Sequence, residues 1–207
     1  VFTVSNYYNQ VFDDKNLWIK KHNLRQDNDT INLLTISANY PHKNLAIIKK
    51  VIPVLQHNFP EFKFKFILTM DREEFGISET DVLNDTIQFL GKVSINQCPD
   101  LYSQSDFLFL PTLLECFSAS YCEAMVMQKP ILTSDLPFAK SICNNAAFYF
   151  DPLDENDIAN AIVHLSYDKK VQEDLIKSGL EQLKTFDTAK QRAEKYLNII
   201  INEKTNT

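Results

Sequence analysis

The sequence predicts an α/β fold: a Rossmann-like, doubly wound parallel sheet with helices on both faces. From Ile31 onward, short apolar runs of strand length alternate with longer amphipathic segments. Strands that alternate with helices require crossover connections, and such crossovers produce a parallel sheet that is covered on both sides. The chain has 207 residues, of which 44% are hydrophobic, and this is enough for one such domain.

Residue type and spacing predict each element in turn. Runs rich in β-branched and aromatic residues predict strands, and apolar residues three or four positions apart predict helices. The expected strands are 31–37, 62–69, 86–90, 107–110, 130–133 and 147–150. The expected helices are 43–57 (with a kink at Pro53), 97–104, 118–128, 137–143, 154–166, 168–184 and 188–203, with a weak helix or loop over 72–83 and a helical stretch from Val11 to Leu24.

Bulk composition excludes several classes of function. The net charge of −6 is opposite in sign to the basic surface of a nucleic-acid-binding protein. No apolar run approaches the length of a membrane span. Three glycines are too few for a glycine-rich dinucleotide or Walker loop, which disfavours a dinucleotide-dependent oxidoreductase. The four cysteines lack C-x-x-C or metal-ligand spacing, so we expect reduced thiols in a cytoplasmic protein.

The segment from Phe109 to Met125 is the most informative part of the chain. An apolar strand leads into a loop that carries Glu115, and a predicted helix then carries Glu123. Because the loop follows a parallel strand, it should lie on the rim of the sheet where ligands of such folds bind. The start of a helix attracts anions and carboxylates accept hydrogen bonds from hydroxyl groups, so this segment suits a nucleotide sugar.

Five separated pieces of the chain resemble, in the right order, the donor-binding half of group 1 glycosyltransferases of the GT-B fold. The pieces are 35–45, 89–94, 102–106, 109–134 and 148–154. Within them, the family's motifs correspond here to Pro111-Thr112, Glu115-Cys-Phe-Ser118, Glu123-Ala-Met125, Lys129-Pro-Ile131 and Asp151-Pro-Leu-Asp154. The resemblance implies one half of a GT-B fold, over about residues 31–166.

The resemblance also implies a role for each candidate site residue. Glu115 would lie beside the transferred sugar, Lys43 would neutralise the departing diphosphate, and Glu123 would accept the ribose hydroxyls. The remaining expected donor contacts are the backbone N–H groups of Phe117, Ser118 and Ala119, the side chain of Val93 at the base, and His42 as a second phosphate contact. We expect no metal and no cofactor, although Asp27-Asn-Asp29 has the spacing of a metal motif.

Ordinary structural roles would also account for these residues one by one. The negative charge of Glu115 would interact favourably with the dipole of the following helix. Glu123 would be an exposed helical acid, and Lys43 would be a solvated lysine at a helix start. His42 would be a loop residue, Tyr102 would pack rather than stack on a base, Ser118 would be an N-cap, and Asp151 and Asp154 would form a turn and cap the next helix. The chain also departs from the family, because Cys116 and Ser118 replace glycines and Ala38 replaces an arginine.

The resemblance implies that this chain is part of a longer protein. We expect residues 1–30 to be a linker from a missing N-terminal acceptor domain, 31–185 to be the nucleotide-sugar-binding domain, and 186–207 to be a helix that packs back toward the missing domain. The chain alone should bind donor and transfer nothing. The expected partners are a nucleotide sugar and a glycan or lipid-linked acceptor, with no nucleic acid.

The function that this points to is donor binding in a retaining glycosyltransferase of surface polysaccharide synthesis. The full-length protein would work in the cytoplasm, in peripheral association with the inner face of the membrane. The alternatives are a non-catalytic nucleotide-sugar-binding or scaffold domain, which would be a degenerate relative of the family, and one half of a nucleotide-sugar epimerase.

Overall fold

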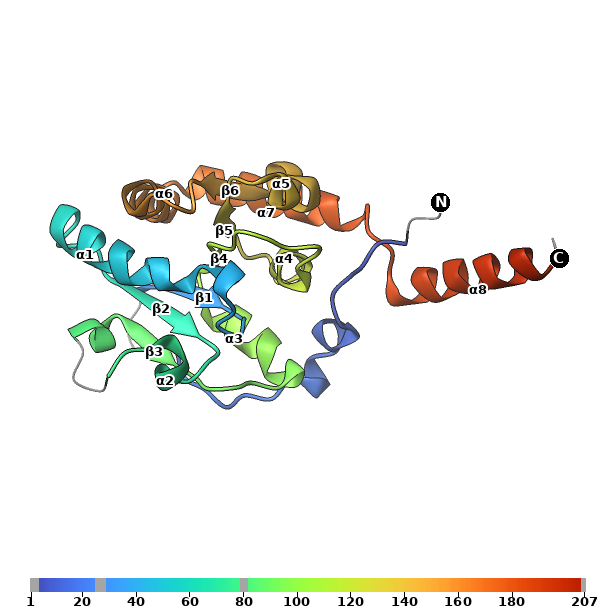
Figure 1. Cartoon of the computed structure of the whole chain (residues 1–207), viewed down its shortest axis with the longest axis horizontal. Coiled ribbons are helices and arrows are strands. Elements are labelled where there is room, and N and C mark those ends of the chain that lie inside the picture. Colours follow the sequence, from blue (N-terminus) through green and yellow to red (C-terminus); the bar gives the residue numbers. More distant parts are fainter. Residues whose placement is uncertain (1–3, 25–28, 79–81, 206–207) are drawn as a thin grey trace.

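The structure, a computed structural model, describes residues 4–24, 29–78 and 82–205. Its centre is a six-stranded parallel sheet in the order β3-β2-β1-β4-β5-β6 (Figure 1). The strands are β1 (Ile31–Thr35), β2 (Phe64–Leu68), β3 (Ile87–Phe89), β4 (Phe107–Leu110), β5 (Ile131–Ser134) and β6 (Ala147–Phe150). The predicted fold class is therefore confirmed.

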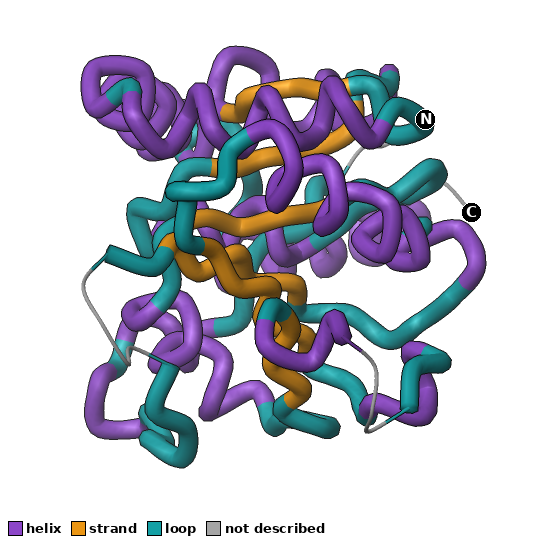
Figure 2. Tube along the Cα trace, turned by 90° about the vertical axis from the view of Figure 1, so that its left-hand side faces the viewer, coloured by secondary structure: helices purple, strands orange, loops and turns teal. Residues whose placement is uncertain are grey.

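Helices cover both faces of this sheet (Figure 2). They are α1 (Ile48–Asn58), α2 (Arg72–Phe75), α3 (Cys98–Gln104), α4 (Ala119–Val126), α5 (Pro137–Cys143), α6 (Glu155–Tyr167), α7 (Lys169–Leu183) and α8 (Ala189–Thr205). One buried cluster joins α1 and α6 to the sheet, and a second joins α3, α4 and α5 to its other face. Successive strand residues alternate between the clusters, as Leu33 and Leu34 do, which is the two-residue period of a strand buried on both sides.

The strand order creates one place where the connections diverge. β1 continues to α1 on one face of the sheet, whereas the neighbouring β4 continues to α4 on the other face. Loops that leave two adjacent strands in opposite directions open a crevice at the carboxyl edge, which is where ligands of such sheets bind. The loops that carry Lys43 and Glu115 are these two loops.

Most predicted elements agree with the structure to within one or two residues, but two segments differ. The predicted helix 43–57 is two short 3₁₀ turns, Pro41–Lys43 and Leu45–Ile47, followed by α1, which continues through Pro53. The predicted helical stretch from Val11 to Leu24 is wrong beyond the 3₁₀ turns Gln10–Asp13 and Lys15–Leu17.

Local side-chain hydrogen bonds explain this second difference. The side chain of Asn9 accepts from Val11 N at 3.0 Å, and that of Asp14 accepts from Asn16 N at 2.9 Å. Short polar side chains that bond the nearby backbone compete with continuous helix. The segment still packs on the domain, because Val11, Phe12 and Leu24 are buried in the second cluster. Asp27 of the Asp27-Asn-Asp29 motif lies outside the described residues.

The last helix lies apart from the sheet. α8 extends away from the rest of the molecule, on the side where the N-terminal segment also lies (Figure 1). The two are joined where α8 begins, because Ser5 N donates to Asp187 Oδ2 at 3.0 Å and Arg192 Nη1 donates to Asn6 Oδ1 at 2.8 Å.

Scarcity of glycine leaves some left-handed backbone positions to other residues. Asn44, Gln128 and Asn144 have φ values of 54°, 54° and 49°. Gln128 is the least suited of the three, because asparagine tolerates this region better than longer side chains do. It follows the C-terminal end of α4, where glycine is the usual residue.

Replacing Gln128 with glycine should therefore stabilise the protein. We expect Gln128→Gly to raise the free energy of unfolding by about 1 kcal/mol, because glycine adopts positive φ without the Cβ penalty. The matched control is Gln56→Gly, an exposed position in α1 where glycine should cost about 1 kcal/mol. Chemical denaturation measures both, and a loss of stability in Gln128→Gly would contradict the prediction.

Candidate functional site

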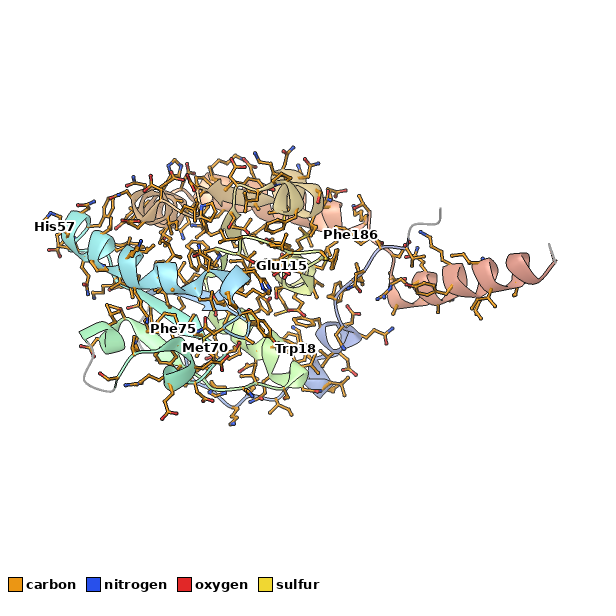
Figure 3. All side chains as sticks on the ribbon, in the orientation of Figure 1. Trp18, His57, Met70, Phe75, Glu115 and Phe186 are labelled. Carbon is orange, nitrogen blue, oxygen red and sulfur yellow. The ribbon has the colours of Figure 1, made fainter. Side chains whose placement is uncertain are left out.

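The loops after β1 and β4 meet at an ion pair between Lys43 and Glu115. The ammonium group of Lys43 donates to Oε1 of Glu115, and their side chains are only 16% and 11% exposed. Lys43 belongs to the 3₁₀ turn Pro41–Lys43, which precedes α1, so its positive charge does not lie at the start of that helix. The carboxylate of Glu115 balances this charge. Figure 3 labels Glu115 near the middle of its view.

Backbone hydrogen bonds hold the same two loops together. The carbonyl oxygen of His42 accepts from Leu113 N at 2.7 Å and from Thr112 Oγ1 at 3.0 Å. Asn44 Nδ2 donates to Pro152 O at 2.8 Å, which joins the loop after β6 to them. The ion pair is therefore part of a junction of three loops at the carboxyl edge of the sheet.

Buried threonines fix the end of β4, from which the Glu115 loop departs. Thr35 Oγ1, on β1, donates to Phe109 O at 2.7 Å, and Thr133 Oγ1, on β5, donates to Leu110 O at 3.0 Å. Threonines on the strands at both sides of β4 thus bond to its last two carbonyl groups. This arrangement gives the Glu115 loop a fixed point of departure.

The loop forms without the two glycines that the family has there. Among the described residues, the non-glycine positions with positive φ do not include Cys116 or Ser118. Ser118 is at the N-cap position of α4 with φ −102° and ψ 116°, values that any L-residue adopts, and its side chain makes no cap bond. The first-turn N–H groups of α4 therefore keep their capacity to bind an anion.

Glu123 lies one turn into α4 and is 6% exposed. Its Oε2 accepts a hydrogen bond of 3.1 Å from the hydroxyl of Tyr102, on α3. Burial raises the pKa of Glu123 to about 7, and the Tyr102 hydrogen bond opposes this rise. The expectation of an exposed helical acid does not fit these observations, and Tyr102 is buried, as the packing interpretation predicted.

Val93 lines a cleft of about 470 Å³ beyond the ends of β1, β2 and β3. Its other lining residues are Ile36, Ser37, Ala38, Thr69, Glu74, Lys92, Ile95 and Cys98. Thr69 Oγ1 accepts from Ser37 N at 3.1 Å, which sets the shape of the floor. The cleft lies beside the switch point, on the β3 side.

The other candidate residues make ring contacts or cap a helix. The exposed ring of His42 stacks on Tyr40, with ring centroids 5.7 Å apart. The ring of Phe117 meets Phe186 edge-on at 5.8 Å, so only its backbone N–H is a candidate contact. Asp154 accepts from Asn156 N at 2.8 Å, which confirms the cap. The predicted ligand roles of His42, Phe117, Ser118, Ala119 and Val93 stay predictions.

The structure reveals two features that the sequence analysis missed. One is the hydrogen bond from Tyr102 to Glu123, and the other is the junction of Thr112 and Leu113 with the His42 carbonyl. Sequence separation hides both, because the partners are 21 and about 70 positions apart. Within the described ranges, no group of three or more His, Cys, Asp or Glu side chains could hold a metal ion, and all four cysteines are free.

An open parallel sheet whose connections diverge at a switch point is the architecture of a doubly wound α/β domain, whose ligands bind at that point. A family model described as glycosyl transferases group 1 matches residues 14–182, and the chain belongs to this family. It is 29% identical over 137 residues to the O-antigen chain mannosyltransferase RfbU of Salmonella typhimurium. The aligned region covers 64% of this chain and 37% of that protein.

Two solved structures show the same fold. Sucrose-phosphate synthase from Thermosynechococcus elongatus matches with a TM-score of 0.70 and 17% identity, over 87% of this chain and 47% of that one. A UDP-forming trehalose-phosphate synthase from Burkholderia xenovorans matches with a TM-score of 0.74 and 13% identity, over 94% and 50%. The chain thus spans half or less of these relatives. None of the helices in the described part of the chain has the length and apolar character needed to cross a membrane.

The buried Glu123 should make stability depend on pH. Its pKa is about 7 in the folded state and near 4.5 when unfolded, so the native state holds the proton more tightly. Stability from this group is fully present below pH 4.5 and is lost as the pH rises through 7. We expect Glu123→Gln to gain about 2 kcal/mol relative to wild type between pH 5 and pH 8, measured by denaturant unfolding.

The control for this prediction is Glu73→Gln, which changes an exposed glutamate on α2. Its stability should follow that of the wild type at every pH. Parallel pH profiles for Glu123→Gln and wild type would show that the carboxyl group is not destabilised by burial.

Proposed function

We propose that this chain is the donor-binding half of a retaining glycosyltransferase, which transfers a sugar from a nucleoside diphosphate to a glycan acceptor. The observation that carries the proposal is the partly buried Lys43–Glu115 pair at the switch point of the sheet, in a chain of the group 1 family. A partly shielded cation and the start of a helix suit a diphosphate, because the ammonium group and the helix-start N–H groups each stabilise negative charge.

Each residue then has a distinct part in the reaction. The base occupies the cleft beside Val93, the ribose hydroxyls donate to Glu123, and the diphosphate lies between Lys43 and the amide groups at residues 117–119. Glu115 accepts hydroxyl hydrogens of the sugar. As the bond to the sugar breaks, negative charge grows on the diphosphate, and Lys43 stabilises it. The leaving diphosphate takes the acceptor's proton on the same face, so the reaction requires no protein nucleophile.

The cellular role is part of the same proposal. The similarity to an O-antigen mannosyltransferase supports a role in surface polysaccharide synthesis, at the cytoplasmic face of the membrane. Since the chain spans 37% of that relative, the acceptor domain would come from the rest of the protein. The exposed Tyr196, Leu197 and Ile200 of α8 would pack against it, and this chain alone would bind donor without transfer.

Donor binding by this chain can be tested with calorimetry on UDP, GDP and ADP sugars. We expect at least one to bind at millimolar concentration or below. Lys43→Ala and Glu123→Ala should each weaken it by about 10- to 100-fold, because each removes a charge-assisted hydrogen bond. The control is Lys50→Ala, an exposed lysine of α1 that carries the same charge change away from the site.

Failure of every nucleotide sugar to bind would favour the scaffold alternative. That alternative is motivated by Cys116, Ser118 and Ala38, which replace the glycines and the arginine of the family pattern.

The ion pair makes a second prediction about the free diphosphate. Without ligand, Glu115 competes for the ammonium group that the diphosphate needs, and it repels the diphosphate directly. We therefore expect Glu115→Gln to bind a nucleoside diphosphate without sugar about fivefold more tightly than wild type. Asp135→Asn, which breaks an exposed pair with Lys140, is the control and should leave affinity unchanged. Weaker diphosphate binding in Glu115→Gln would contradict the competition.

A further inference from the structure

Tyr102 is a fully buried tyrosine whose hydroxyl reaches the carboxylate of Glu123. The hydroxyl oxygen is 3.1 Å from Glu123 Oε2 and 3.2 Å from the carbonyl oxygen of Ser120, in the first turn of α4. Both acceptors belong to α4, whereas Tyr102 belongs to α3. The tyrosine therefore joins the two helices at the level of the proposed ribose contact.

This hydrogen bond leaves half of the carboxylate free. Oε1 of Glu123 accepts no hydrogen bond from the residues that the structure describes, and in that part of the chain Glu123 forms no ion pair. Oε1 is not one of the fully buried side-chain atoms that lack a partner, so it keeps some exposure and is open to a donor from a ligand. A vicinal diol offers two O–H donors, so it could satisfy Oε1 and share Oε2.

The other groups around Glu123 do not stabilise its charge. The thiols of Cys98 and Cys122 also lie near it, and burial raises the pKa of each to about 12, so both stay neutral at physiological pH. Burial alone favours the protonated form of Glu123, and the Tyr102 hydroxyl is the group that opposes this effect. The pKa of Tyr102 itself is raised well above 10 by burial, so it remains a donor.

Packing holds the tyrosine ring in one orientation. Phe12, in the segment before β1, meets the ring edge-on with centroids 5.9 Å apart. Both rings are buried in the second core cluster, together with Val11. A ring that cannot turn presents its hydroxyl in one direction, which is the condition for aiming a partner group.

We infer that Tyr102 is a positioning residue that favours the ionised form of the Glu123 carboxylate and turns it so that its second oxygen accepts the diol of a nucleotide ligand. The inference rests on the proposed function, because it assigns the ribose diol to Glu123. Tyr102 touches no ligand in this scheme and acts only through Glu123.

The test compares wild type with Tyr102→Phe, which removes the hydroxyl and keeps the ring. In the ligand-free protein, the Glu123 carboxyl midpoint is followed by carbon-13 NMR of labelled glutamate and assigned by its loss in Glu123→Gln. We expect the midpoint to rise by about one pH unit in Tyr102→Phe, because a hydrogen bond to the charged form is lost.

The binding arm uses the nucleoside diphosphate that binds wild type best, titrated by calorimetry from pH 6 to 9.5. If only the ionised carboxylate binds, the affinity of Tyr102→Phe for the nucleoside diphosphate should be about threefold weaker than that of wild type at pH 7.5. The two affinities should be equal near pH 9.5. Glu123→Gln should lack this pH dependence, and adding Tyr102→Phe to it should change affinity no further.

The matched control is Tyr121→Phe. Tyr121 is also fully buried, but its hydroxyl bonds Thr133 Oγ1 at 2.8 Å and does not reach Glu123. This variant loses a buried hydroxyl from the same domain, so it reports any general loss of stability. Its carboxyl midpoint and binding profile should match those of wild type.

An unchanged carboxyl midpoint in Tyr102→Phe would overturn the inference. So would a loss of affinity that is the same at every pH and is matched by Tyr121→Phe. If wild type binds no nucleoside diphosphate at any pH while the midpoint still moves in Tyr102→Phe, the proposed function is overturned, and the coupling of Tyr102 to Glu123 is confirmed separately.

Discussion

The ion pair between Lys43 and Glu115 is the interaction around which the rest of the site is arranged. It joins the loops that leave β1 and β4, two adjacent strands whose following helices cover opposite faces of the sheet. Because little of either side chain is exposed, each charge depends on the other for compensation. The carbonyl of His42, bonded to Thr112 and Leu113, keeps the loops at the distance that the pair requires.

In an ion pair of this kind, the carboxylate compensates the charge of the ammonium group while no ligand is bound. An anion that competes with the carboxylate can then bind the ammonium group. Glu123 forms no ion pair with the residues that the structure describes, and the Tyr102 hydroxyl is the group that favours its charge. Burial of an acid costs stability at a pH where the acid would otherwise ionise, and acids with raised pKa values cluster at functional sites. The site therefore combines a charge that an ion pair compensates with an acid whose ionised form is opposed by burial and favoured by one hydroxyl.

Much of the fold could be predicted because its signals are local. Short continuous apolar runs define strands such as Phe107–Leu110, which the structure reproduces. The helix Pro137–Cys143 was equally predictable, since proline at its start and apolar spacing are local features. The prediction from Val11 to Leu24 failed because Asn9 and Asp14 bond nearby amides, a competition that apolar spacing does not reveal.

The sequence by itself determined the class of fold and the order in which Lys43, Glu115 and Glu123 follow their strands, because strand patterns and motif order are written along the chain. Only the tertiary structure decided that Lys43 pairs with Glu115 and that Glu123 is buried against Tyr102. These contacts join residues 72 and 21 positions apart, and their geometry depends on how the sheet orders its strands. Strand order is a property of packing, so no local pattern contains it.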